Sequence, residues 1–259
     1  MTLIFDKYQG AGNDFIIIDN RDGKQNLSCQ EISSLCDRRF GIGADGLILV
    51  EKSDIADFAM KFYNSDGKTA SMCGNGGRCI AKYAFDHKIA GTNMKFLAED
   101  GMHEAIIIND ESVKIKMIDV NGITVFHDGM WTNTGVPHFV KFVDDISNVN
   151  VKIEGRKLAD DKRFAPDRTN VNFTDNINGY RIATYERGVE GETLACGTGT
   201  VATALCINAK HDIQSPIAIQ AKGGLLKVYF EKKNCNYENI WLEGPALKVF
   251  EGKTDGRKF

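Results

Sequence analysis

The sequence has 259 residues, which is enough for one large domain or two small ones. Hydrophobic residues make up 42% and charged residues 26% of the chain, so a disordered chain is excluded. The net charge of −3 offers no basic excess for phosphates, and no apolar run reaches the roughly 20 residues of a membrane helix. We therefore expect no nucleic-acid or membrane partner. Because the N-terminus does not resemble a signal peptide, we expect a cytoplasmic location.

Strand-sized runs rich in Ile, Val, Phe and Tyr recur along the whole chain, and Gly, Asn or Asp lies near most of their ends. The predicted strands are Phe15–Asp19, Leu47–Val50, Phe58–Tyr63, Glu104–Ile108, Val113–Met117, Tyr180–Tyr185, Leu226–Phe230 and Ala246–Phe250. Helical patterns are few by comparison, which favours a sheet-rich fold.

Helices are predicted at Gln30–Arg39, with Ser28 as a candidate cap, and at Asn75–His87 and Gly199–Ala209. The last two patterns are apolar almost all round, and a helix without a polar face has to be enclosed. We therefore predict an α+β fold with two pseudo-symmetric domains. Each would be a curved, mostly antiparallel sheet wrapped around one buried helix.

The two halves of the chain share motifs at a constant spacing. Cys73-Gly-Asn-Gly and Cys196-Gly-Thr-Gly both open a buried helical pattern and lie 123 positions apart. The segments Gly12-Asn13-Asp14-Phe15 and Gly135-Val136-Pro137-His138-Phe139 begin at the same separation. This indicates an internal duplication with a boundary in the turn-rich stretch 119–130. We assign residues 1–118, together with the C-terminal strand 247–259, to one domain and residues 119–246 to the other.

The cysteines and histidines do not form a metal or disulfide pattern. Seven cysteines, an odd number, occur without a signal peptide or any C-x-x-C pair, which argues against a disulfide framework and a zinc ribbon. No H-E-x-x-H motif is present, so we expect no metal. Most of the cysteines should be small buried hydrophobic residues.

Cys73 and Cys196 differ from the other cysteines because each begins a helix with a glycine-rich turn. Free N–H groups and the helix dipole at such a start favour an anion, either a bound carboxylate or the thiolate itself. Lowering a thiol pKa by two units needs about 2.7 kcal/mol, and a helix start supplies at most about 2 kcal/mol. A further cation or hydrogen-bond donor is therefore required, and His138 and Arg187 are the candidates.

Two facing loops of this kind would place a sulfur on each side of one ligand. Since neighbouring thiolates repel, one sulfur should hold the proton that the other lacks. Such a pair suits the inversion of a stereocentre, with one sulfur as base and the other as acid. Taken singly, each of these residues also has an ordinary structural interpretation, as a buried thiol, a turn residue or a solvated ion pair.

Five ordered segments carry a resemblance over nearly the whole chain: GAGNDFIIID (10–19), GIGADGLILV (41–50), NSDGKTASMCGNGGRC (64–79), GVPHFV (135–140) and YERGVEGETLACGTGT (185–200). In these segments the sequence closely resembles the diaminopimelate epimerase family. The resemblance implies interconversion of LL- and meso-diaminopimelate without pyridoxal phosphate or another cofactor, for lysine and peptidoglycan-precursor biosynthesis. It also implies two similar domains that flank a cleft holding the active site.

The resemblance implies roles for individual residues as well. Cys73 and Cys196 would be the acid–base pair, supported by His138 and Glu186. The implied substrate-binding residues are Asn13, Asn64, Gly74, Asn75, Asn170, Glu186, Arg187, Gly197 and Thr198. Among these, Gly74-Asn75 and Gly197-Thr198 would hold the carboxylate of the reacting amino acid, and the asparagines its polar ends.

The sequence departs from many family members at two positions. Gly46 stands where some members carry a Gln, and Val136 stands where many carry an Asn. The departures leave open how the distal end of the substrate is held. Also open are the oligomeric state, for which a homodimer is one option, and the identity of the cysteine that is deprotonated at rest.

Three alternatives compete with this prediction. The chain could resemble proline racemase or hydroxyproline epimerase, although their first motif typically reads Cys-Gly-His and here it is Cys73-Gly74-Asn75. A non-enzymatic amino-acid-binding module would not need both sulfurs. A Cys–His hydrolase uses one nucleophilic cysteine and gives no reason for a second matched loop. In the preferred interpretation the partner is a small amino-acid substrate.

Overall fold

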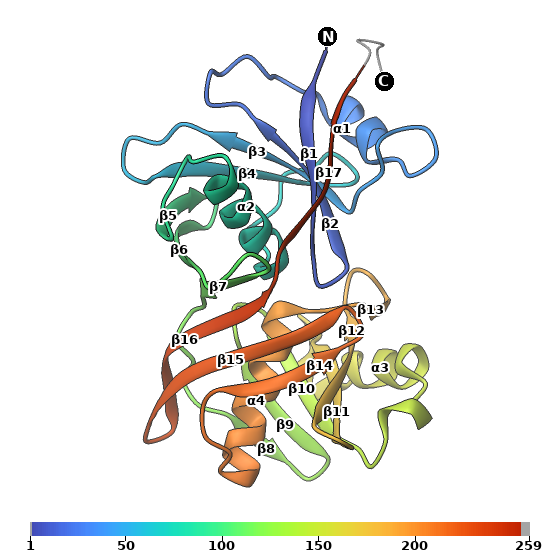
Figure 1. Ribbon diagram of the computed structural model, residues 1–259. Helices are drawn as coiled ribbons and strands as arrows, with labels where there is room; N and C mark the ends of the chain where they lie inside the picture. Colours follow the sequence, from blue (N-terminus) through green and yellow to red (C-terminus); the bar gives the residue numbers. More distant parts are fainter. Residues whose placement is uncertain (1, 255–259) are drawn as a thin grey trace. The chain divides into compact units, whose positions relative to one another are not determined.

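The computed structural model describes residues 2–254. It divides the chain into two compact units, Met1–Ile115 with Pro245–Phe259, and Lys116–Gly244 (Figure 1). The last strand, β17 (Leu247–Lys253), returns to the first unit, where it pairs antiparallel with β1 (Ile4–Gly10). Within residues 2–254, no helix has the length and apolar character needed to cross a membrane.

In the first unit the strands follow the order β17-β1-β2-β3-β4-β5-β6-β7. Neighbouring strands run antiparallel, except for the parallel pairs β2–β3 and β4–β5. The remaining strands and the helices of this unit are β2 (Asn13–Asp19), α1 (Cys29–Cys36), β3 (Gly46–Glu51), β4 (Phe58–Asn64), α2 (Gly74–Asp86), β5 (Asn93–Ala98), β6 (Gly101–Ile107) and β7 (Ser112–Lys116).

In the second unit the strands follow the order β8-β9-β10-β11-β12-β14-β15-β16, and the short β13 pairs with β12. The parallel pairs are β10–β11 and β12–β14. The elements are β8 (Thr124–Phe126), β9 (Gly129–Asn133), β10 (Pro137–Phe142), η1 (Ile146–Asn148), α3 (Val151–Ala159), η2 (Lys162–Phe164), β11 (Asn170–Asn176), β12 (Tyr180–Glu186), β13 (Gly191–Thr193), α4 (Gly197–His211), β14 (Ile217–Ala221), β15 (Gly224–Lys233) and β16 (Asn236–Pro245).

The two units repeat the same succession of elements. A parallel pair of strands needs a crossover, and helices supply it in the same places of both units. The crossover from β2 to β3 contains α1, and that from β10 to β11 contains α3. Likewise α2 joins β4 to β5, and α4 lies between β12 and β14. The predicted α+β fold and the internal duplication are confirmed.

Each unit encloses one helix. In α2 every residue from Gly74 to Ala84 is buried, and the helix contacts β1, β2 and β17 as well as β6 (Figure 1). Because these strands belong to different parts of the strand order, the sheet has to curve around the helix. The helix α4 is buried from Gly199 to Asn208 and contacts strands from β9 to β15. The apolar pattern of both helices thus reflects their enclosure.

Local signals account for the shorter helices. Ser28 is the N-cap of α1 and forms a capping box with Glu31, as its position before the helix suggested. The helix ends at Cys36, three residues before the predicted end. The helix α3 was not predicted from the sequence. Its nine residues include four charged ones, and only Val151, Gly155 and Ala159 are buried. A short, mostly polar helix gives too weak a periodic signal.

Candidate active site

The first half-site is built around Cys73 at the start of α2. Cys73 is the N-cap of the helix, with an extended backbone, and its Sγ accepts a hydrogen bond from the Gly76 N–H at 3.2 Å. Its side chain is partly exposed, whereas Cys79 on the same helix is buried. Free N–H groups and the helix dipole favour negative charge at this point. The position therefore suits a thiolate, a carboxylate, or both side by side.

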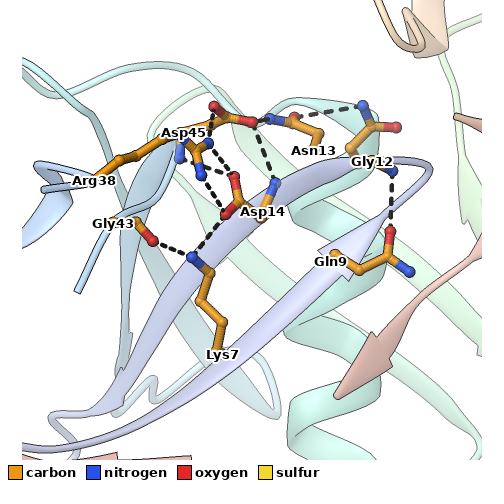
Figure 2. A network of polar contacts seen from close by, with 9 residues as sticks. Lys7, Gln9, Gly12, Asn13, Asp14, Arg38, Gly43 and Asp45 are labelled. Carbon is orange, nitrogen blue, oxygen red and sulfur yellow. Dashed lines mark hydrogen bonds and ion pairs between the residues drawn. The ribbon is translucent and has the colours of Figure 1, made fainter. Parts of the chain in front are cut away.

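A chain of amide contacts links α2 to the β1–β2 turn region. The Asn75 Nδ2 donates to Asn13 Oδ1 at 3.4 Å, and the Asn13 Nδ2 donates to Asp45 Oδ2 at 2.6 Å. Figure 2 shows that Asp45 belongs to a wider network in which Arg38 bonds both Asp45 and Asp14. The side-chain amide of Asn13 is thereby held in one orientation at the edge of this half-site.

Asp14 provides the fixed charge of that network. Burial acts to raise the pKa of its carboxyl, but hydrogen bonds from Arg38 and Lys7 outweigh burial and lower the pKa below its ordinary value. The Lys7 Nζ lies 2.7 Å from Asp14 and also contacts the Gly43 carbonyl (Figure 2). Asp14 is therefore ionised and neutralised by two cations at neutral pH.

Asn64 lies at the C-terminal end of β4, exposed, and pairs with Gly46 of β3. Gly46 pairs on its other side with Phe15 of β2. A Cβ atom at Gly46 would lie 2.6 Å from the Phe62 ring and from the Tyr63 carbonyl oxygen. The ring of Phe62 therefore occupies the space that a glutamine at this position would need, which gives a physical reason for the departure at Gly46.

The second half-site is built around Cys196 at the start of α4. Cys196 is the N-cap of this helix and is buried, at 9% exposure. Burial, and then the negative charge of Glu186, raise the pKa of its thiol above the ordinary value. The Glu186 carboxylate is itself held by Thr193, whose Oγ1 donates to Glu186 Oε1 at 2.6 Å. At neutral pH the Cys196 sulfur in this half-site keeps its proton.

His138 lies fully buried under the N-terminus of α4. The Asn172 Nδ2 donates to the Phe139 carbonyl and to His138 Nδ1, at 3.3 and 3.1 Å. The Asn172 Oδ1 accepts from Thr184 Oγ1 at 2.9 Å, which fixes the orientation of the amide. Since Nδ1 of His138 accepts a hydrogen bond, the imidazole proton resides on Nε2.

A directed chain of hydrogen bonds follows from this tautomer. The His138 Nε2–H donates to Thr198 Oγ1 at 2.9 Å, and the Thr198 hydroxyl lies 3.5 Å from Cys196 Sγ. A hydroxyl that already accepts from the imidazole has its own proton available for the sulfur. Thr198 is thus the group through which Asn172 and His138 act on Cys196.

The sequence named His138 as a candidate cation or hydrogen-bond donor near a thiol, and the structure favours the donor. Burial, and then the charge of Arg187, lower the pKa of its imidazole to about 3. A neutral imidazole cannot attract a thiolate as a cation does. His138 contributes an oriented hydrogen bond through Thr198 instead.

Asn170 and Arg187 come together beside His138. Asn170 of β11 is the parallel partner of His138 in β10, and its Oδ1 accepts the Arg187 N–H at 3.0 Å. The Arg187 guanidinium donates to the carbonyls of Asp167 and Arg168. Within residues 2–254, Arg187 has no ion pair with a carboxylate. Its planar donors are therefore suited to bind a carboxylate of a ligand.

Three residues of the half-sites were missed from the sequence: Arg78, Asn172 and Thr184. Asn172 lies two positions after Asn170 on β11, on the same face of the strand, so the alternation N-V-N was an available signal. Arg78 was detectable as a charged residue in the first turns of a mostly apolar helical pattern. Within the described chain, no group of His, Cys, Asp and Glu side chains is arranged to hold a metal ion.

The sequence of the chain is similar to one family of known proteins. A family model described as "Diaminopimelate epimerase" matches residues 5–121 and 130–249. A diaminopimelate epimerase of Flavobacterium psychrophilum is 46% identical over 95% of this chain and 97% of its own length. One from a Hydrogenobaculum species is 42% identical over 96% of this chain and 98% of its own length.

Solved structures reproduce the fold at low sequence identity. A phenazine biosynthesis protein of the PhzF family from Bacillus anthracis gives a TM-score of 0.77, with 13% identity over 98% of this chain and 99% of that one. At such identity the likeness concerns the fold alone.

Proposed function

Because the chain belongs to the diaminopimelate epimerase family, we propose that it interconverts LL- and meso-2,6-diaminopimelate with Cys73 and Cys196 as its acid–base pair. The chain is an epimerase, an enzyme of the isomerase class. The observation that carries the proposal is that both cysteines are N-caps of the buried helices at equivalent places in two repeated units.

The proposed reaction inverts one α-carbon of the substrate. The thiolate of one cysteine takes the α-proton from one face, and the thiol of the other cysteine returns a proton to the opposite face. At the end of a turnover the two sulfurs have exchanged protonation states, so the reverse reaction uses the same groups in opposite roles. Each proton removed is matched by one returned, and no external acid or oxidant is needed.

The negative charge that develops at the α-carbon and its carboxylate needs fixed donors. We propose that the N–H groups at the first turns of α2 and α4, at Gly74-Asn75 and Gly197-Thr198, bind that carboxylate. Preorganised donors of this kind stabilise charge without reorganising during the reaction. The helix starts therefore serve both the substrate and the sulfurs.

The remaining candidate residues are proposed to bind or support. Glu186 and the His138–Thr198 contact would control the proton of Cys196. Arg187 is suited to a carboxylate of the distal amino-acid group, and the Asn170 side chain holds the Arg187 backbone in place. Asn13 and Asn64 supply amides at the edge of the first half-site. Together they would select a substrate with two amino-acid ends.

The test is incubation with LL-diaminopimelate in heavy water, followed by mass spectrometry and NMR. We expect one deuterium at the inverted α-carbon of the meso product. Label entering proline or hydroxyproline, but not diaminopimelate, would favour the proline racemase alternative. Ligand binding with no label in any of these amino acids would favour a non-enzymatic binding module.

We further propose that the reaction needs no pyridoxal phosphate and supplies meso-diaminopimelate for lysine and peptidoglycan precursors. Hydroxylamine, which removes pyridoxal phosphate from enzymes that use it, should leave the exchange rate unchanged. A loss of activity that added pyridoxal phosphate restores would contradict this part of the proposal.

A further inference from the structure

Arg78 is a buried cation in the middle of the first half-site. Its side chain is 0% exposed, although arginine is one of the residues least often enclosed in a protein. The guanidinium donates to the Gly74 carbonyl at 3.1 Å, to the Pro245 carbonyl at 3.3 Å and to Asn75 Oδ1 at 2.8 Å. Among residues 2–254, no carboxylate forms an ion pair with it. Each guanidinium nitrogen has a hydrogen-bond acceptor, but an acidic side chain does not neutralise the charge.

A cation is costly in such a place unless an anion lies nearby. Burial lowers the pKa of Arg78 to about 10, so the side chain stays charged at neutral pH. Two thiols, Cys79 and Cys73, lie within its electrostatic reach. Burial raises the pKa of Cys79 well above the ordinary value, so this thiol stays neutral. Cys73, with its N–H donor and helix start, is the better site for the negative charge.

Ion-pair partners neutralise the other charges that form pairs on α2 and on the strands around it. They are Lys7 with Asp14, Arg38 with Asp14 and Asp45, Arg21 with Asp19, Lys82 with Asp86, Lys95 with Glu104, and Lys248 with Asp6 and Glu251. His87 and His103 lie against Asp6 and Asp100. Arg78 is therefore the charge on α2 whose effect on Cys73 is not cancelled by an adjacent carboxylate of the first unit.

The repeat provides an internal comparison. Val201 stands 123 positions after Arg78, at the equivalent place of α4, and it is fully buried as well. Near Cys196 the charged neighbour is instead Glu186, whose negative charge raises the thiol pKa. The two half-sites thus have opposite charges beside their cysteines, Arg78 on α2 beside Cys73 and Glu186 on β12 beside Cys196.

We propose that Arg78 is a positioning residue that holds Cys73 as the thiolate of the resting enzyme, while Cys196 rests as the thiol. The guanidinium lies against the carbonyl of Gly74, the residue that follows Cys73 in the chain, and so places its charge at the first turn of α2. A helix start alone falls short of a two-unit shift of the thiol pKa, and Arg78 supplies the missing cation. This inference depends on the proposed use of both cysteines.

The test measures titration of each cysteine in the substrate-free enzyme, so it does not depend on turnover. Iodoacetamide labelling is followed across pH 5–10 and quantified by mass spectrometry for Cys73 and Cys196 separately. In the unmodified enzyme we expect the labelling midpoint of Cys73 to lie at least one pH unit below that of Cys196. A midpoint for Cys73 at or above that of Cys196 would overturn the proposal.

Three variants separate charge from packing. Arg78→Met should raise the Cys73 midpoint by one unit or more, about tenfold slower labelling at pH 7, and leave the Cys196 midpoint in place. Arg78→Lys should restore most of the shift because it keeps the charge. Lys82→Met is the matched control, since it removes a buried cation from the same helix that is already paired with Asp86. It should leave the Cys73 midpoint unchanged.

The outcomes decide the proposal even where a variant is unstable. If folded Arg78→Met keeps the Cys73 midpoint, or if Arg78→Lys behaves like Arg78→Met, a charge effect is refuted and Arg78 only ties α2 to Pro245. If Arg78→Met does not fold, the ordering in the unmodified enzyme and the lysine variant decide. The labelling midpoints could also shift as expected in an enzyme that puts no deuterium into diaminopimelate in heavy water. That result would refute the proposed function and leave the electrostatic inference intact.

Discussion

The two units place different residues at the same positions beneath equivalent helices. In the first unit Phe15, Ile48 and Phe62 lie where the strand register of the second unit places His138, Asn172 and Thr184. The rings of Phe15 and Phe62 pack edge to face, with centroids 5.8 Å apart. Beneath α4 the equivalent positions instead form a hydrogen-bonded polar group.

The helices differ in the opposite sense. We call Phe15, Ile48 and Phe62 the apolar row, and His138, Asn172 and Thr184 the polar row. The helix α2, which packs on the apolar row, carries the buried Arg78. The helix α4, which packs on the polar row, carries Val201 at the equivalent position. Since a shared backbone would by itself give both sulfurs the same environment, their difference has to come from these side chains. The comparison teaches that a duplicated fold can supply two matched positions while substitutions around them set unequal proton affinities, which an acid–base pair requires.

The largest effect is expected when the sulfur of either unit is removed, because the proposed reaction needs both. Cys73→Ala and Cys196→Ala should each lower kcat by about 10³-fold, within the range of about 10²–10⁴ that acid–base groups contribute. Turnover is measured by circular dichroism or by a coupled assay, with far-ultraviolet spectra to verify folding. The exposed cysteines Cys29 and Cys235 provide controls, and their alanine variants should keep full activity. Near-normal turnover in either active-site variant would disprove the two-sulfur mechanism.

Alanine substitutions of the glycines at the helix starts measure how tightly each helix packs on the strands beneath it. A Cβ at Gly199 would lie 2.4 Å from Asn172 Oδ1, so Gly199→Ala has to displace a bonded amide and should cost about 1–3 kcal/mol of unfolding free energy. A Cβ at Gly76 would meet Cys73 Sγ at 3.2 Å and the flexible end of Met60 at 3.5 Å. Gly76→Ala should therefore cost less. Urea denaturation measures both, and equal losses would show that the polar row is no more rigid than the apolar one.

The hydrogen-bond chain beneath α4 predicts a more modest effect. Asn172→Ala frees His138 Nδ1 and should lower kcat about tenfold, or roughly 1.4 kcal/mol, with little change in KM. The nitrogen shifts of His138 in an NMR spectrum should show loss of the single Nε2–H tautomer. Thr174→Val, on the same strand, removes a bond to the Arg181 carbonyl and is the control. An unchanged tautomer and kcat in Asn172→Ala would contradict the assigned direction of the chain.

The sequence predicted the fold well because the fold depends on patterns that are local. The glycine-bounded apolar runs, the enclosed helices and the repeated Cys-Gly-x-Gly turn each have a physical meaning that needs no coordinates. The constant spacing of 123 positions also allowed the two units to be paired. The shorter, polar α3 was missed because tertiary packing of only a few residues holds it.

The electrostatics of the half-sites could not be predicted in the same way. The charge state of His138 depends on its complete burial and on the charge of Arg187, and its tautomer depends on the amide of Asn172. None of these is written in the local sequence. Arg78 was overlooked because a charged residue in an apolar helix is ordinarily placed at the surface. Its carbonyl partners include Pro245, which lies 167 positions away along the chain. In the proposed mechanism, such long-range contacts, and not the motif alone, set which sulfur rests as the thiol.

The last expected effect concerns acid stability and follows from the difference between His138 and Phe15 at equivalent positions. Burial, and then the charge of Arg187, lower the pKa of His138 from 6.5 to about 3, so between these pH values the unfolded chain binds a proton that the native protein does not. Unfolding free energy should consequently fall as the pH falls from about 6.5 toward 3, by at most ~1.4 kcal/mol per pH unit from this group.

His138→Gln should remove that dependence, as measured by urea unfolding between pH 4 and 7. His127, whose side chain is 89% exposed, is the control, and His127→Gln should keep the slope. Phe15 occupies the equivalent position of the first unit and cannot titrate, so the effect belongs to the polar row alone. If the slope persists in His138→Gln, the imidazole takes up its proton in the native protein as well. The neutral donor to Thr198, on which the contrast between the two cysteines depends, would then be lost at mildly acidic pH.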